Sequence, residues 1–222
     1  MQLRKYRLAS MTPLLIPIAS ILVALFLGGI LVYFQGSNPI TAYRVLFSTA
    51  FGSVDGLSST LAKATPLVLS GLAVAICLRA GLFNIGAQGQ LISGALASAW
   101  AGYYFVGLPM FVHIPLALLF GAFFGALVAL ISGALKAFRG VHEVISTIML
   151  NSIVIALADY LASTPFKEPD QPLTRTPMIE DSARIPHLFG LPFGFFIAVL
   201  ISYIFWWVLK NTTSGFRIRN YR

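Results

Sequence analysis

The sequence predicts an all-α fold, a polytopic transmembrane helical bundle of about six spans. Hydrophobic residues make up 58% of the 222 residues and charged residues only 10%, whereas a soluble domain carries about 25% charged residues. Several apolar stretches also approach the roughly 20 residues that a helix needs to cross a bilayer. We therefore treat 1–222 as a single transmembrane domain.

The spans follow from the length of each apolar run. The first ten residues, MQLRKYRLAS, are basic and then apolar, as in a signal peptide. The apolar run over 11–34 is longer than the 7–15 residues typical of a signal peptide, so it is read as a transmembrane helix. The predicted spans are 13–34, 61–78, 86–106, 109–135, 144–162 and 192–209.

Basic residues set the predicted orientation of these spans. With the N-terminus in the cytoplasm, ten of the 15 Lys and Arg residues fall on the cytoplasmic side, as the positive-inside rule requires. The net charge of +8 reflects this bias. Because no basic run is interleaved with aromatic residues on a polar background, a nucleic-acid partner is not expected, and the partner surface is the lipid bilayer.

Two predicted outer loops, 35–60 and 163–191, are long enough to form structure of their own. In the first, apolar residues recur at helical spacing, which predicts a short helix at the membrane interface: Ile40, Tyr43, Val45, Leu46 and Phe47. The second loop is polar and carries five prolines. It is either a passive linker or a docking surface for an external partner.

The motifs of the common enzyme classes are absent from the sequence. "GQLISGAL" has P-loop glycine spacing but lacks the lysine and the following serine or threonine. No His, Cys, Asp and Glu cluster has metal-ligand spacing, and the single cysteine, Cys77, lies in an apolar run. We predict that the chain is not an enzyme, has no metal and no cofactor, and acts in transport.

The stretch AGLFNIGAQGQ, 80–90, is the first polar interruption of the apolar runs. Polar backbone at membrane depth is tolerated only where protein buries it or where it lines a water-filled path. Asn84 and Gln88 are four residues apart and share a face if they lie on a helix. We predict a broken or re-entrant segment with inward amides; a cytoplasmic turn after Arg79, followed by a helix start, explains the glycines equally well. A second face, which follows with Gln90, Gly94, Ala97 and Ala101, is rich in small residues and suits close packing.

The second polar interruption is a stripe on one helix face, Glu143, Thr147 and Asn151. Polar side chains in a membrane helix usually face the bundle interior. Glu143 also fits a role in complementing the positive end of its helix. Asn151 is either a packing residue between helices or a lining residue. The Gly121–Gly125 motif, GAFFG, predicts a helix-packing face.

These strings together resemble a known family. "PLVLSGLAVAICLRAGLFNIGAQGQ" and "GVHEVISTIMLNSI" are similar to the permease subunit of bacterial ABC importers for simple sugars and nucleosides. The nucleoside-type branch, which works with a solute-binding lipoprotein, is the best match. The resemblance runs from about residue 39 to the C-terminus.

The resemblance implies roles and partners. Asn84, Gln88 and Gln90 would lie along the translocation pathway, and Glu143, Thr147 and Asn151 would shape the core around it. "TTSGFRIR" resembles the lead-in to the ATPase coupling loop, here 210–222, with Gly215, Phe216, Arg217 and Arg219 at the matching positions. The implied partners are a cytoplasmic ATP-binding subunit that binds the ATP, a second permease subunit, an extracytoplasmic solute-binding lipoprotein and a small polar solute, at the bacterial inner membrane.

The sequence departs from the family at two positions and in length. Gln88 stands where an acid is more usual, and His142 stands where an asparagine is. The family continues past the coupling loop, so 1–222 resembles the N-terminal part of a longer domain that is truncated at its C-terminus. A product that ended there is expected not to couple to an ATPase, and co-purification with the ATPase tests this.

Two alternatives from other classes stay open. An ion-coupled secondary transporter places acids near the membrane midplane, whereas Glu143 and Asp159 lie near predicted helix ends. In a non-transporting assembly protein or truncated remnant, the polar residues would only hold helices together. Whether the solute is a nucleoside or a sugar is not encoded in amides and hydroxyls alone.

Overall fold

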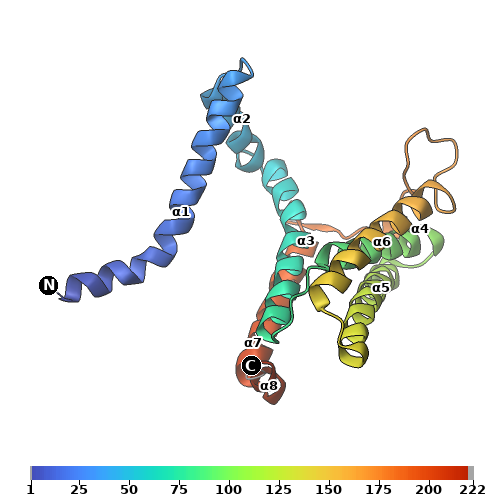
Figure 1. Cartoon of the computed structure of the whole chain (residues 1–222). Helices are drawn as coiled ribbons and strands as arrows, with labels where there is room; N and C mark the ends of the chain where they lie inside the picture. The colour runs from blue at the N-terminus through green and yellow to red at the C-terminus, as the bar shows by residue number, and fades with distance from the viewer. Residues whose placement is uncertain (1, 220–222) are drawn as a thin grey trace. The chain divides into compact units, whose positions relative to one another are not determined.

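The computed structural model describes residues 2–219, and side chains from residue 16 onward except those of 214 and 219. It confirms the predicted all-α fold (Figure 1). The helices are α1 Gln2–Phe34, α2 Pro39–Phe51, α3 Val54–Arg79, α4 Ala87–Tyr104, α5 Met110–Arg139, α6 Glu143–Ser163, α7 Phe193–Asn211 and α8 Thr213–Arg219. A short 3-10 helix, η1 (Asp181–Ala183), and two strands of two residues each, β1 (His187–Leu188) and β2 (Leu191–Pro192), precede α7.

Among the described residues, five segments are long and apolar enough to cross a membrane: Ile16–Phe34 of α1 and the whole of α3, α5, α6 and α7. The sequence predicts about six spans. The difference is the predicted span 86–106, which corresponds to α4, a helix of 18 residues with glutamines in its first turn.

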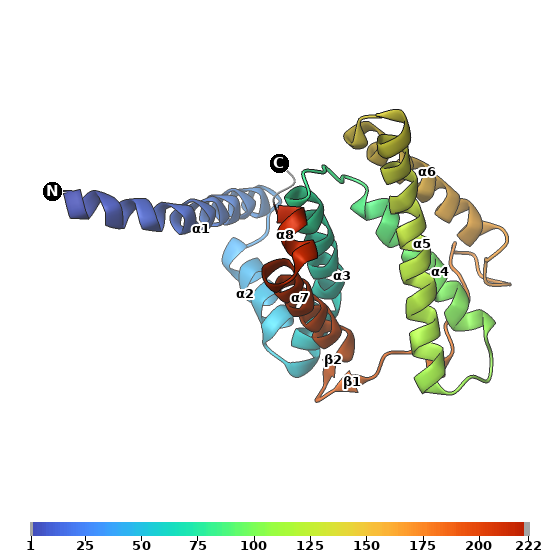
Figure 2. The ribbon, with the colours of Figure 1, turned by 90° about the horizontal axis from the view of Figure 1, so that it is seen from below.

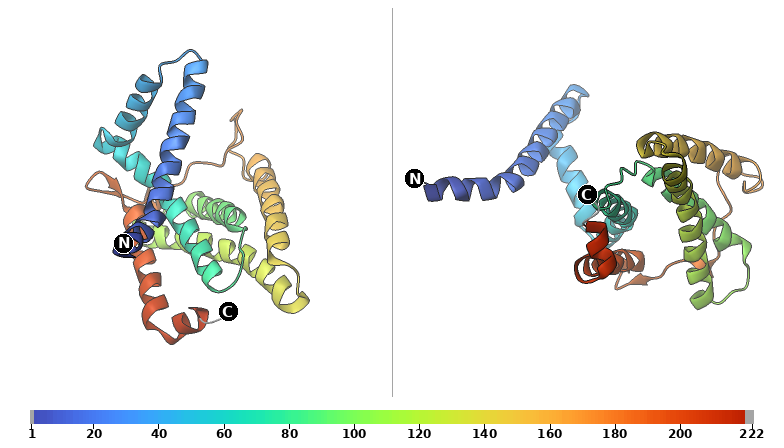
Figure 3. Two further views of the ribbon diagram at one scale, coloured as in Figure 1. Left: turned by 60° about the vertical axis from the view of Figure 1, so that its left-hand side comes forward. Right: turned by 60° about the horizontal axis from the view of Figure 1, so that its bottom comes forward.

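The chain divides into two compact units, Met1–Thr60 and Leu61–Arg222. In the first unit, α1 and α2 fold back on each other (Figure 3). The Tyr43 hydroxyl donates to the Leu25 carbonyl, and Gly28 leaves room for it, since a Cβ there would lie 2.9 Å from the Tyr43 oxygen. Asn38 caps α2 by accepting from the Ile40 N–H at 2.9 Å. The helix predicted within 35–60 is therefore confirmed as α2.

The core of the second unit is formed by α4, α5 and α6, and its most extensive contact joins α4 to α5. A Cβ on Gly94 would lie 2.8 Å from the Gly121 carbonyl oxygen, and one on Gly125 would lie 3.1 Å from the Gln90 carbonyl oxygen. Backbones this close are possible only between small residues. The packing role predicted for the GAFFG motif is confirmed.

The second unit also contains the β1–β2 hairpin, α7 and α8. The β1–β2 hairpin pairs His187 with Pro192 and leads into α7, which lies beside α3 (Figure 2). Thr212 then begins α8, because its hydroxyl oxygen accepts from the Gly215 N–H at 3.1 Å. One domain over 1–222 stays a prediction.

Candidate functional site

A non-helical joint connects α3 to α4. Gly81, with φ +73°, ends α3 in the left-handed conformation that glycine adopts without strain, and α4 begins only at Ala87. Between them, the Asn84 side-chain oxygen accepts from the Gly86 N–H at 2.9 Å, which forms an Asx turn. The segment 82–86, hereafter the joint, is non-helical, as both the predicted broken segment and the alternative of a turn followed by a helix start require.

Asn84 and Gln88 do not share a helix face, because Asn84 precedes α4. Asn84 pairs instead with Gln90 through two reciprocal amide hydrogen bonds, each of 3.2 Å. The Gln88 side chain is exposed and has no hydrogen bond to the described residues. Turn chemistry at Asn84 thus overrides the four-residue spacing.

The three residues predicted to form a stripe on α6 contact residues of the joint. Glu143 accepts from the Phe83 N–H at 3.4 Å, and Asn151, two turns further along, donates to the Ile85 carbonyl at 2.8 Å. Thr147 lies between them, with its Cβ 3.2 Å from where a Cβ on Gly86 would be. At 1.5 Å per residue, the joint therefore reaches about 12 Å beyond the first residue of α6.

Asn151 also caps α4 from a different helix. The N-cap residue Gly86 has no side chain to cap with, and the N–H of Gly89 donates instead to the Asn151 oxygen at 2.8 Å. A Cβ on Gly89 would lie 2.7 Å from that oxygen, so only glycine admits this approach. Both ends of the Asn151 amide are thereby engaged by backbone, which fits the packing role better than the lining role.

An ion pair connects the last turn of α5 to the first residue of α6. Gly140, with φ +64°, ends α5 and turns the chain so that the Lys136 ammonium lies 2.6 Å from a Glu143 carboxylate oxygen. The side chains are 37% and 16% exposed, so solvent screens the pair and its contribution to stability is small. The sequence does not predict this ion pair, because Lys136 and Glu143 lie on two different helices that the turn at Gly140 connects.

The polar residues line a small cavity of about 110 Å³. Its lining comes from α3, the joint, α4, α5 and α6, and its polar residues are Cys77, Asn84, Gln90, Ser132, Lys136, Glu143 and Thr147. Small-molecule sites occupy about 300–1,000 Å³, and a water about 30 Å³. The cavity is therefore of the size of a few waters, and its amides already bond to one another.

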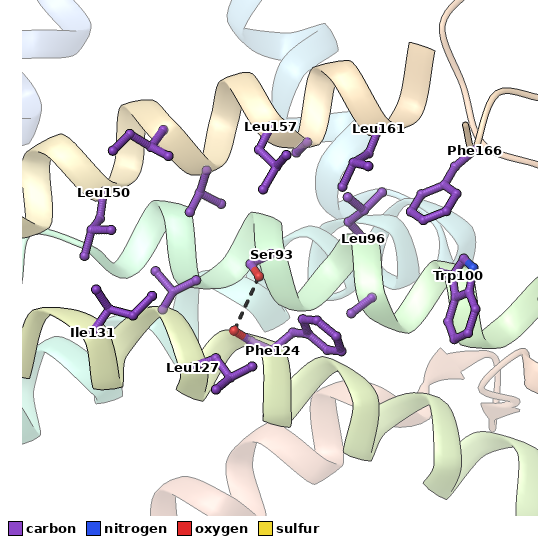
Figure 4. Close-up of a pocket in the computed structure, with 15 residues that line it drawn as sticks. Ser93, Leu96, Trp100, Phe124, Leu127, Ile131, Leu150, Leu157, Leu161 and Phe166 are labelled. Carbon is purple, nitrogen blue, oxygen red and sulfur yellow. Dashed lines mark hydrogen bonds between the residues drawn. The ribbon is translucent and has the colours of Figure 1, made fainter. Parts of the chain in front are cut away.

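A second, larger hollow lies between α4, α5 and α6 and has a volume of about 520 Å³ (Figure 4). Its walls are apolar apart from Ser93 and the Trp100 indole, and the Ser93 hydroxyl donates to the Phe124 carbonyl at 3.4 Å. Such walls offer little to orient a polar solute. The polar chemistry of this unit is concentrated at the joint.

His113 anchors the loop 163–191 to the bundle. The imidazole is fully buried near the start of α5, with Nε2 at 3.2 Å from the Ala101 carbonyl and Nδ1 at 2.8 Å from the Ser182 hydroxyl. Because the carbonyl only accepts, Nε2 donates, and in the neutral ring Nδ1 accepts from Ser182. The Glu180 N–H also donates to the Gly102 carbonyl at 2.9 Å. The sequence gives no sign that His113 and Ser182, 69 residues apart, meet.

We expect His113→Ala to release this segment of the loop. Two hydrogen bonds of a buried group are lost, at about 1 kcal/mol or more each, so trypsin cleavage after Arg184 accelerates by about 10-fold or more. The rate is measured on the detergent-solubilised chain, with cleavage after Arg175 as the internal reference. His187→Ala, an exposed histidine of the same loop, is the control. Equal rates in both variants would contradict the anchoring role.

The residues predicted to couple to an ATPase lie on α8. Gly215 is buried against α7, since a Cβ there would overlap the Val208 carbonyl and lie 2.6 Å from Leu209. Phe216 and Arg217 are exposed. The side chain of Arg219 and residues 220–222 of the predicted loop lie outside the described part of the chain, so the coupling role stays a prediction.

Comparison with known proteins defines the class of this membrane bundle. Residues 56–222 match the family model described as branched-chain amino acid transport system / permease component. The chain belongs to this family of transport permeases, which confirms the resemblance to an ABC importer permease drawn from the FNIG-x-x-GQ and EVISTIMLN strings. No solved structure matches the chain.

Curated relatives include transport permeases for different solutes. The chain is 36% identical to the guanosine ABC transporter permease protein of Bacillus subtilis over 93% of its own length and 60% of the relative. It is 33% identical to the nucleoside ABC transporter permease protein of Lactococcus lactis, over 92% and 59%. It is 38% identical to the glucose ABC transporter permease protein of Haloferax volcanii, over 79% and 46%. The chain thus spans at most about 60% of these relatives.

Proposed function

We propose that this chain is a membrane-spanning permease subunit that forms part of the translocation pathway of an ABC importer for nucleosides or simple sugars. The observation that carries the proposal is the joint, whose non-helical backbone and amides follow α6 for about 12 Å, from Glu143 to Asn151. Backbone of this kind is kept at membrane depth only where protein buries it or a water-filled path passes. Family membership and the names of the relatives support the same class.

The chain supplies the path and not the energy. It needs no cofactor of its own and is not an enzyme, since a cytoplasmic ATP-binding subunit would bind the ATP. A second permease subunit completes the pathway, and a solute-binding lipoprotein delivers the solute to the face that carries the loop 163–191. The N-terminus is cytoplasmic, which places Arg79, Lys136 and Arg139 at the inner ends of their helices.

Gln88 is the pathway residue best suited to meet a solute. Its amide is exposed in the first turn of α4, whereas those of Asn84, Gln90 and Asn151 are engaged within the protein. Glu143 is paired with Lys136 at a helix end. This placement is unlike the midplane acid of an ion-coupled transporter, so the importer is favoured over that alternative.

The test combines assembly with uptake. The chain is purified from native membranes, and its companions are identified; an ATP-binding subunit and a second permease are expected. Uptake of labelled guanosine and of labelled glucose is then measured for the unmutated chain and for Gln88→Leu. We expect the variant to assemble normally and to take up the transported solute about 10-fold more slowly. Gln35→Leu, at the end of α1, is the matched control. A solitary chain, or uptake that is indifferent to Gln88, would refute the proposal.

A further inference from the structure

A groove between α3 and α7 combines an apolar wall with two cations. Its volume is about 380 Å³, and α3 and α7 lie side by side there (Figure 2). The lining comes from one face of each helix: Leu72, Ala75, Ile76 and Arg79 of α3, and Ser202, Trp206, Leu209 and Lys210 of α7. None of the described residues that line the groove is acidic.

Both cations are exposed and lack a carboxylate partner among the described side chains. Arg79 is the last residue of α3, and Lys210 lies in the last turn of α7. The Lys210 ammonium lies 5.0 Å from the centre of the Trp206 ring, so a cation–π contact holds it at the groove. The groove thus has positive charge at one end that nothing in the described chain neutralises.

The lining changes from charged to apolar along the helix axes. Leu72 precedes Arg79 by seven residues and Ser202 precedes Lys210 by eight, which corresponds to about 10–12 Å. Both helices are long and apolar enough to cross a membrane. Trp206 beside Lys210 is typical of the membrane interface. The cations therefore lie at headgroup depth and the apolar wall at the depth of the acyl chains.

We propose that this groove binds an anionic phospholipid of the inner leaflet. The phosphate lies between Arg79 and Lys210, and an acyl chain follows the wall formed by Leu72, Ile76 and Leu209. Basic pockets between membrane helices on the cytoplasmic side recognise anionic headgroups in this way. The proposal rests on the orientation in which Arg79 and Lys210 are cytoplasmic, and not on the identity of the solute.

The test reads lipid contact at a single tryptophan. The sequence has three tryptophans, so Trp100→Phe with Trp207→Phe leaves Trp206 as the only one. This variant is reconstituted into vesicles that contain brominated phosphatidylglycerol or brominated phosphatidylcholine, because bromine quenches tryptophan on contact. We expect at least about fivefold preference for phosphatidylglycerol, the effect of one basic residue at an anionic surface.

Charge variants locate the site. Arg79→Gln with Lys210→Gln is expected to abolish the preference, whereas Arg139→Gln, a basic residue at the end of α5 outside the groove, leaves it intact. Replacing chloride by inorganic phosphate at equal ionic strength also leaves it intact if the ligand is a lipid. Equal quenching by both lipids, retention in the double variant, or loss in phosphate would overturn the proposal.

The same measurement on the assembled complex separates a lipid from a protein occupant. Persistent quenching of Trp206 by phosphatidylglycerol in the co-purified complex supports the lipid site, and shielding by a partner subunit overturns it. Failed uptake or failed co-purification with an intact lipid preference would refute the proposed function alone.

Discussion

Asn151→Leu is expected to destabilise the protein by about 3 kcal/mol and to reduce uptake at least 10-fold. Leucine has the same branching and the same number of side-chain heavy atoms as asparagine but leaves the Gly89 N–H and the Ile85 carbonyl without partners. Each unsatisfied backbone group costs about 1–3 kcal/mol, and loss of the cap of α4 is included in that cost. The free energy of unfolding is measured by SDS titration of the chain in mixed micelles.

Ser152→Leu is the matched control for this experiment. Ser152 is the next residue on α6, is exposed, and bonds only to the Ile148 carbonyl of its own helix at 3.4 Å. We expect a change of less than about 0.5 kcal/mol, as at other surface positions. If Asn151→Leu behaved like this control, the joint would not depend on α6.

Gly94→Ala is expected to destabilise the α4–α5 pair by about 2 kcal/mol. The added Cβ would lie 2.8 Å from the Gly121 carbonyl oxygen, and backbone on both sides must move to admit it. Overpacking of this kind typically costs 1–3 kcal/mol. The same unfolding titration measures it, and the packing in the unmutated chain serves as the reference.

Gly133→Ala makes the same chemical change where there is space. Gly133 lies in α5 with no atom within 4 Å of the added Cβ, so the helix gains up to about 1 kcal/mol from the better propensity of alanine. Opposite signs for the two substitutions are the expected result. A loss at Gly133 equal to that at Gly94 would show that packing against Gly121 is not the cause.

Apolar length predicts most of the helices, and local chemistry explains the boundaries that it misses. The predicted span 61–78 begins at Val54 in the structure, because Ser53 accepts from the Gly56 N–H at 3.0 Å and starts the helix among polar residues. The predicted span 86–106 is α4, whose first turn lies beside Asn151, through Gly89, rather than at the end of α6.

The polar residues of the site could be predicted, but their partners could not. The four-residue spacing of Glu143, Thr147 and Asn151 correctly places them on one face of α6. Which backbone groups they meet depends on contacts some 60 residues away, between Asn151 and Gly89 or between Glu143 and Phe83. Periodicity contains no information on such distances, and the same limit hid the contact between His113 and Ser182.

The cap on α4 has a consequence for how the chain is made. Gly89 and Asn151 are 62 residues apart, so the first turn of α4 emerges from the ribosome well before the side chain that completes it. At about 5–20 residues per second, the interval is about 3–12 seconds. During this time the Gly89 N–H of α4 and the Ile85 carbonyl of the joint lack the Asn151 side chain that binds them. Insertion of α6 is therefore the step that ends the exposure of the nascent chain to membrane proteases and chaperones.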